Sequence, residues 1–217
     1  MELPNRDALE RDFTGTLARL GTKHRRELLT LIGDPPDVDN VPSEFWSRVE
    51  SDMQDELAAL LLLLFITSAE FHGGDAAAAA ARGATFAGTR SAMLSSDFVT
   101  HSQEMLAGYG TAWDVSPTTA DVAGNVESIF GRVRSEMIAV TETTLAQSQG
   151  AEWAIGATVG LSDEDEWQTE GDSSVCAICK PLDGMPRVVW SREFPAGPPS
   201  HVNCRCEIIY ANAMAFT

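Results

Sequence analysis

The sequence predicts a mainly α-helical protein with a helical body of about five helices and a small C-terminal α+β lobe. Three observations support this prediction. Apolar residues recur at helical spacing over most of residues 1–150, glycine and proline pairs interrupt the pattern, and all four cysteines lie between residues 176 and 206. We therefore expect a helical body over residues 1–150 and a small lobe with short β-strands over residues 151–217.

The first two helices of the body have clear ends. The first carries Leu9, Phe13 and Leu17 on one face and ends at Gly33-Asp34-Pro35-Pro36. Ser43 begins the second, which Gly73-Gly74 ends. Its most apolar run, residues 58–67, is far shorter than the roughly 20 residues of a membrane-spanning helix. We therefore expect a buried helix, with a partner interface as the alternative, and no membrane association.

The remaining sequence of the helical body predicts three more helices. One follows the cap Asp75 and runs to about residue 94, and a shorter one follows Asp97. Ser116-Pro117-Thr118 marks a turn before the last helix, whose apolar stripe extends from residue 122 to residue 140. We expect this last helix to end at Gly150, because glycine adopts the left-handed cap conformation at low cost.

The charge of the chain excludes one class of function. The sequence has 32 acidic and 15 basic residues, which gives a net charge of −17. Such a surface repels phosphate backbones, so sequence-specific nucleic-acid binding is not expected. The 44% apolar share is ordinary for a globular protein and suffices for a core.

The cysteines predict a metal site. Cys176 and Cys179 form a CxxC pair, and His201, Cys204 and Cys206 form an HxxCxC cluster after a short insertion. Two clusters of soft ligands are typical of a tetrahedral zinc site, so the lobe is expected to be zinc-stabilised by one structural ion. Four of the five residues are needed. Either Cys176 and Cys179 bind zinc together with His201 and one of Cys204 and Cys206, or the four thiolates bind zinc and His201 forms hydrogen bonds around them.

Other uses of these residues are less favoured. Two disulfides suit an even cysteine count, but the sequence opens with a polar, acidic stretch rather than a secretory signal. A catalytic zinc keeps one position open, and the deaminase pattern requires a His-x-Glu, which none of the four histidines provides. We therefore predict structural zinc and no enzymatic activity.

The same region carries a family resemblance. Its order of motifs resembles the C-terminal signature of the phage head morphogenesis family, the Mu F-like minor capsid proteins, over roughly residues 130–210. The matching residues are Arg134, Ile138, Glu142, Thr143, Trp167-Gln168-Thr169, Asp172, the CxxC pair, Leu182-Asp183-Gly184, Pro198-Pro199 and His201-x-Asn203-Cys204-Arg205-Cys206.

The resemblance implies a structural role in a tailed-phage particle. It implies a minor capsid protein at the portal vertex or inner capsid, oligomeric in the particle, with portal and other capsid proteins as partners. Its location would then be the virion, after assembly in the host cytoplasm. A head–tail connector or adaptor protein is the alternative, and a zinc-dependent enzyme or ejected effector is a weaker one.

Overall fold

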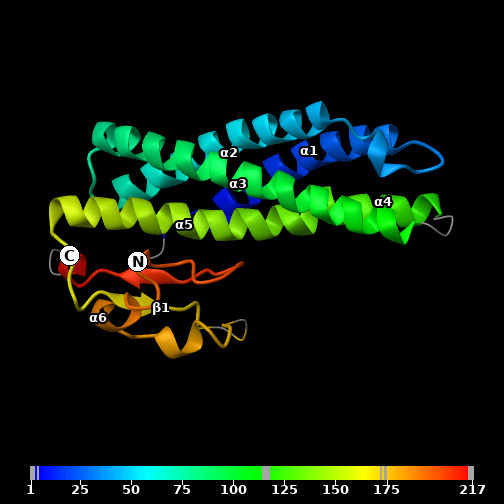
Figure 1. Cartoon of the computed structure of the whole chain (residues 1–217). Coiled ribbons are helices and arrows are strands. Elements are labelled where there is room, and N and C mark those ends of the chain that lie inside the picture. Colours follow the sequence, from blue (N-terminus) through cyan, green and yellow to red (C-terminus); the bar gives the residue numbers. More distant parts are fainter. Residues whose placement is uncertain (1–2, 4, 114–117, 172, 174, 215–217) are drawn as a thin grey trace. The chain divides into compact units, whose positions relative to one another are not determined.

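The computed structural model describes residues 3, 5–113, 118–171, 173 and 175–214 (Figure 1). Helices account for 71% of the structure, which confirms the mainly α fold class. Within the described residues, the long helices are α1 (Arg6–Ile32), α2 (Ser43–Phe71), α3 (Ala76–Ala112), α4 (Thr119–Phe130) and α5 (Arg132–Thr158). A short 3-10 turn, η1 (Val38–Asn40), lies between α1 and α2.

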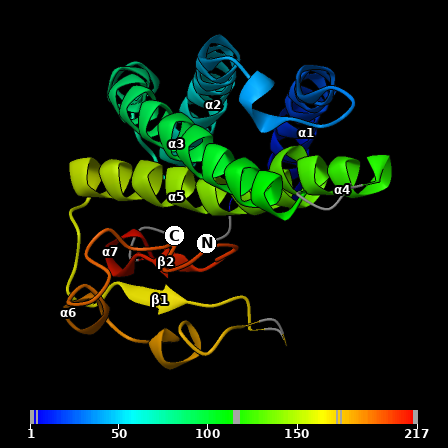
Figure 2. The same cartoon turned by 45° about the vertical axis from the view of Figure 1, so that its right-hand side comes forward.

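The C-terminal region contains a small antiparallel sheet. Strands β1 (Glu166–Gln168) and β2 (Glu207–Ile209) lie side by side, with Trp167 opposite Ile208 (Figure 2). Between them lie the 3-10 turn η2 (Lys180–Leu182) and the short helix α6 (Arg187–Trp190), and α7 (Ala211–Met214) follows β2. The expected small α+β region is therefore present.

The chain divides into two compact units that differ from the division expected at residue 150. One, here called the site unit, comprises Met1–Glu10, Leu60–Phe86 and Met137–Thr217. The other, here called the aromatic unit, comprises Arg11–Ala59 and Ala87–Glu136. Each unit thus combines segments that are distant in sequence. A separately folding body, 1–150, and lobe, 151–217, remain a prediction.

Aromatic rings pack against one another in the core of the aromatic unit. Phe45 and Ile129 are fully buried, and the Trp46 ring stacks on Phe130 with an interplanar angle of 17°. Arg134 lies over the Phe98 ring at 4.0 Å and donates to the Ile129 carbonyl. Burial of this guanidinium lowers its pKa to about 10. Arg134, one of the residues on which the family resemblance rests, therefore takes part in helix packing and not in the cysteine cluster.

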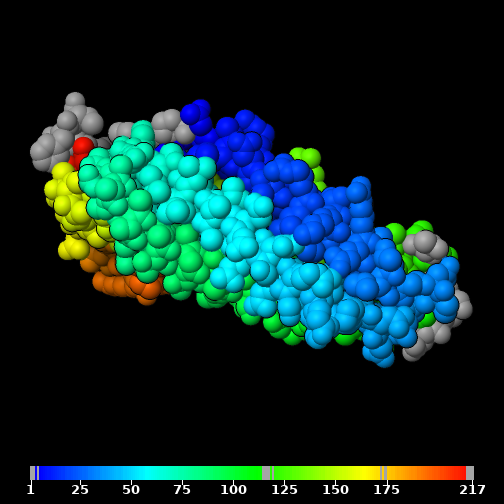
Figure 3. Space-filling view, turned by 90° about the horizontal axis from the view of Figure 1, so that it is seen from above, coloured from blue at the N-terminus to red at the C-terminus, as the bar shows by residue number. Residues whose placement is uncertain are grey.

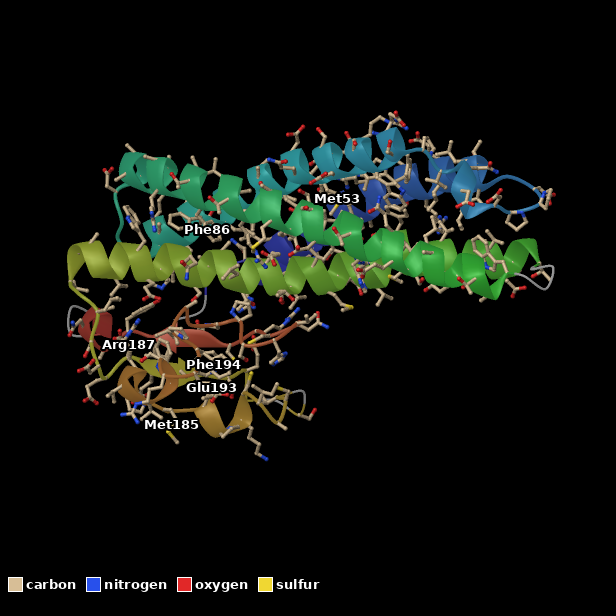
Figure 4. All side chains as sticks on the ribbon, viewed as in Figure 1. Met53, Phe86, Met185, Arg187, Glu193 and Phe194 are labelled. Carbon is tan, nitrogen blue, oxygen red and sulfur yellow. The ribbon has the colours of Figure 1, made fainter. Side chains whose placement is uncertain are left out.

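The site unit depends on close approach between helices. Phe65, Ala69, Ala79 and Ala154 form a buried cluster. A Cβ added at Gly83 would lie 2.9 Å from Cδ1 of Phe65, so α2 and α3 approach each other closely at this point. The segments of α2 and α3 in this unit lie side by side on the face seen in Figure 3. The C-terminal region is tied to α5 through Arg187, whose guanidinium donates to Glu152 and Asp165 at 3.0 and 3.2 Å (Figure 4).

The predicted end of the last helix at Gly150 was wrong. Helix α5 continues to Thr158, and Gly150 lies inside it. A Cβ at this position would stand 2.4 Å from the carbonyl oxygen of Phe65 on α2. The glycine is therefore required by the contact between two helices, and not by a left-handed cap.

Two further helix boundaries differ from expectation. Gly131 has an extended backbone, so the single stripe from residue 122 to residue 140 is two helices, α4 and α5. Conversely, Asp97 lies within an unbroken α3. Buried Ser95 and Ser102 continue the stripe that contains Phe98, and the Ser102 hydroxyl donates to the Phe98 carbonyl at 2.6 Å. Serines with a satisfied hydroxyl thus serve as core residues there.

The other predicted helix boundaries are confirmed. Helix α1 ends before Gly33, whose φ is 77°, and α2 begins at Ser43. Thr118 caps α4 through a reciprocal capping box with Asp121. Ser116 and Pro117, which the sequence assigned to the same turn, lie outside the described residues. Across the described helices, none combines the length and apolar character needed to cross a membrane.

The contact at Gly150 gives a testable prediction. Gly150→Ala should lower the free energy of unfolding by about 1–3 kcal/mol, because overpacking outweighs the gain of about 1 kcal/mol in helix propensity. Gly88→Ala is the matched control, since its Cβ meets nothing within 4 Å. It should stabilise by up to about 1 kcal/mol. Denaturant unfolding would measure both, and equal stabilisation by the two substitutions would contradict the contact.

Candidate metal centre

The structure brings together all five residues expected from the sequence. Cys176 and Cys179 lie in the loop between β1 and η2, where Cys179 caps the 3-10 turn. His201 lies in a turn, and Cys204 and Cys206 lead directly into β2. The five side chains come from two segments separated by more than twenty residues, and both segments belong to the site unit.

Short distances connect the five donor atoms. His201 Nε2 lies 2.9 Å from Cys176 Sγ and 3.1 Å from Cys179 Sγ. The Sγ atoms of Cys179 and Cys204 are 3.8 Å apart. Two groups have all their donor atoms within 4.8 Å of one another: Cys176, Cys179 and His201, and Cys179, Cys204 and Cys206. Cys179 belongs to both groups and therefore lies at the centre of the cluster.

The donor set fits zinc. All four cysteines are free thiols, so no disulfide occupies them. A tetrahedral ion with Zn–S bonds of about 2.3 Å has neighbouring sulfurs about 3.8 Å apart. The Cys179–Cys204 separation equals that edge. Thiolates with one imidazole are soft donors, which favours zinc over calcium or magnesium.

The pKa values of the four thiols are shifted by their neighbours in the cluster and by burial. Hydrogen bonds from the Cys206 side chain lower the pKa of Cys204 to about 5, and the same pairing raises the pKa of Cys206. Burial raises the pKa of Cys179 to about 11. The backbone N–H of Cys179 lowers the pKa of Cys176. Only some of the four thiols therefore ionise readily to thiolates, and metal binding would displace the protons of the others.

Hydrogen bonds around the cluster orient the ligands. His201 Nδ1 lies 2.7 Å from the Val202 carbonyl oxygen, a contact that requires Nδ1 to carry the proton. The Nε2 lone pair then faces the sulfurs, as metal ligation requires. The Ser200 hydroxyl lies 3.2 Å from Cys179 Sγ and 3.8 Å from Cys204 Sγ. Ser200 had no signal in the sequence beyond its position next to His201.

Helix α5 forms hydrogen bonds with the backbone of the segment from His201 to Cys206, here called the second ligand segment. The backbone N–H of Asn203, whose φ is 62°, donates to Thr141 Oγ1 at 2.9 Å. Thr144 Oγ1 donates to the Cys204 carbonyl at 2.5 Å. Sequence reasoning missed both threonines. Their spacing of three places them on one helix face, but nothing in the sequence indicates which segment that face contacts.

The other motif residues form the frame of the first ligand loop. Asp183 Oδ1 accepts hydrogen bonds from the N–H and the hydroxyl of Thr169, both at 2.9 Å. Gly184, with φ 71°, donates to the Trp167 carbonyl at 2.8 Å. The Trp-Gln-Thr and Leu-Asp-Gly motifs therefore bind each other around the CxxC loop. Asp172 lies outside the described residues, and Glu142 and Thr143 are buried in the site unit.

A family comparison covers the same region. Residues 115–209 match the family model described as Phage Mu protein F like protein. This segment is therefore similar to the Mu F-like family. The match confirms the resemblance drawn from the motifs, and it includes all five residues of the cluster within somewhat less than half of the chain. No curated protein and no solved structure matches the chain.

The geometry predicts how the ligands respond to substitution. Cys176→Ser and Cys179→Ser should each abolish tight binding of one zinc per chain, because either change removes a thiolate that every expected ligand set includes. The region from residue 160 to residue 210 should become protease-sensitive while most helix content remains. Ile178→Ser is the matched control, since this half-exposed residue lies between the two cysteines. Elemental analysis, circular dichroism and limited proteolysis would measure the effects; an unchanged melt and protease pattern would refute the site.

Proposed function

We propose that this protein is a structural component of a tailed-phage particle, a minor capsid or head morphogenesis protein of the portal vertex or inner capsid. The Mu F-like match over residues 115–209 supports this proposal. The matched segment includes the complete Cys/His cluster and the two motifs that frame it. The sequence similarity therefore covers the residues that form this cluster and the hydrogen bonds around it.

We propose that the cluster binds one structural zinc ion through four of its five donors. Cys179 belongs to either ligand set, because it lies in both groups of close donors. Four protein donors would complete the tetrahedral coordination of the ion and leave no position for a reactive water molecule, which supports a structural rather than a catalytic role. The ion would connect the CxxC loop to the segment that enters β2.

The ligand set can be determined by two substitutions. If His201 and Cys204 bind zinc, His201→Asn should abolish stoichiometric zinc and Cys206→Ser should retain it. If His201 and Cys206 bind zinc, both variants should lose it. If the four thiolates bind zinc, Cys206→Ser should abolish it and His201→Asn should retain it. Cobalt substitution provides a second readout, because the charge-transfer band increases with the number of thiolates. Retention of zinc by both variants would contradict a site built from four of these five donors.

Exposed apolar side chains of the C-terminal region support a role in binding other particle proteins. Ile178, Met185, Val188 and Val189 are between 38 and 50% exposed. Met185 lies on the outside of this region (Figure 4). We propose that portal or capsid proteins cover them in the assembled particle.

This proposal predicts a defect in assembly without a defect in folding. The double substitution Val188→Glu, Val189→Glu should reduce incorporation into particles by at least tenfold, because two charges would be buried at the contact. Met93→Glu is the control, since Met93 is similarly exposed but lies on α3. Quantitative mass spectrometry of purified heads, with tails as a separate fraction, measures incorporation. Wild-type protein found only in tails or connectors would contradict the head assignment.

A further inference from the structure

The first turn of α1 contains a buried ion pair. Arg6 and Glu10 are each only 4% exposed, and Arg6 Nε donates to Glu10 Oε1 at 3.0 Å. Burying two charges is costly unless their remaining hydrogen-bonding groups are also satisfied. The hydrogen-bond partners of those groups therefore indicate the structural role of this ion pair.

The remaining partners come from the second ligand segment and its support. Arg6 Nη1 donates to the Arg205 carbonyl at 3.1 Å, and Arg6 Nη2 donates to Thr144 Oγ1 at 2.6 Å. Glu10 Oε2 accepts a hydrogen bond from Arg205 Nη2 at 2.5 Å. Arg205 Nη1 also lies 3.6 Å from Asp7. All of these residues belong to the site unit.

These contacts fix the backbone between two candidate ligands. The Cys204 carbonyl accepts from Thr144, whose hydroxyl oxygen accepts from Arg6. The Arg205 carbonyl accepts from Arg6 directly. Successive carbonyls of Cys204 and Arg205 are thus fixed by one guanidinium, which acts once through Thr144 and once directly. Because Cys204 and Cys206 flank Arg205, the position of Arg6 constrains both sulfurs.

We propose that Arg6 is a positioning residue for the metal centre, so that docking of the first turn of α1 and zinc binding stabilise each other. This inference rests on the proposed zinc site. A ligand that requires an ordered segment 203–206 favours every contact that orders it. By thermodynamic linkage, the effect is reciprocal: docking of α1 raises zinc affinity, and zinc strengthens docking.

The first test uses the unmodified full-length protein. Hydrogen–deuterium exchange with mass spectrometry would compare zinc-loaded protein with protein treated with a chelator. Removal of zinc should accelerate exchange in a peptide covering residues 5–12, although none of these residues is a candidate ligand. A peptide covering residues 45–57 of the aromatic unit serves as the internal control and should be unaffected. Unchanged exchange in residues 5–12 would overturn the proposal.

The second test uses variants of Arg6. Arg6→Met keeps the length of the side chain but removes all three hydrogen bonds, and it should lower zinc affinity by 10- to 100-fold in competition with a chromophoric chelator. Arg6→Lys should restore only part of the affinity, because one ammonium group cannot reproduce the planar fork. Arg19→Met is the matched control, since Arg19 is exposed on the same helix and bonds to Thr16. It should bind zinc like the wild type.

The outcomes separate this inference from the zinc proposal. One zinc per wild-type chain, with wild-type affinity in Arg6→Met, would retain the metal site and overturn the role of Arg6. A wild type that binds no zinc would overturn both. If Arg6→Met fails to fold, the exchange experiment on the wild type decides the question by itself.

Discussion

The structure of the C-terminal region depends on holding four thiols and one imidazole within a few ångströms of one another. Its sheet has only two strands of three residues, β1 and β2, which is too little regular structure to fix a site alone. Two other constraints act instead. Trp167 and Trp190 form a buried apolar base beneath the cysteines, with ring centroids 5.8 Å apart. Helix α5 supplies a rigid support for the backbone of Asn203 and Cys204.

The position of α5 follows from small residues rather than from large ones. Gly150 and Ala154 allow α5 to approach α2 closely. The absence of a side chain at Gly74 likewise leaves room for the ring of Trp153, which lies on α5. This packing fixes the face of α5 that carries Thr141 and Thr144. A helix that is displaced by one side-chain width would move both hydroxyls away from the carbonyl and N–H that they bind. Helix packing and the geometry of the Cys/His cluster are therefore linked through a single rigid element.

The sequence predicted the residues of the Cys/His cluster better than it predicted the residues that support them. Cys176, Cys179, His201, Cys204 and Cys206 were found because soft donors at close spacing are rare and have few other uses. Ser200, Thr144 and Arg6 were not found, because serine, threonine and arginine are common and their role arises only when distant segments meet. Arg6 and Arg205 are 199 positions apart, and no local pattern connects them. The same reason explains Gly150, whose function lies in a contact with α2.

The proposed structural ion would explain why this region combines little regular structure with many hydrogen bonds from outside it. A small lobe gains stability when a metal joins its loops, but the ligands must be deprotonated and brought together first. The Ser200 hydroxyl and the His201–Val202 contact orient donors locally, whereas α5 and the first turn of α1 fix the segment that carries Cys204 and Cys206. The cost of assembling the cluster is thus divided between local contacts and two helices. In a particle component, this arrangement would give the exposed apolar residues around Val188 a rigid base from which to contact a partner.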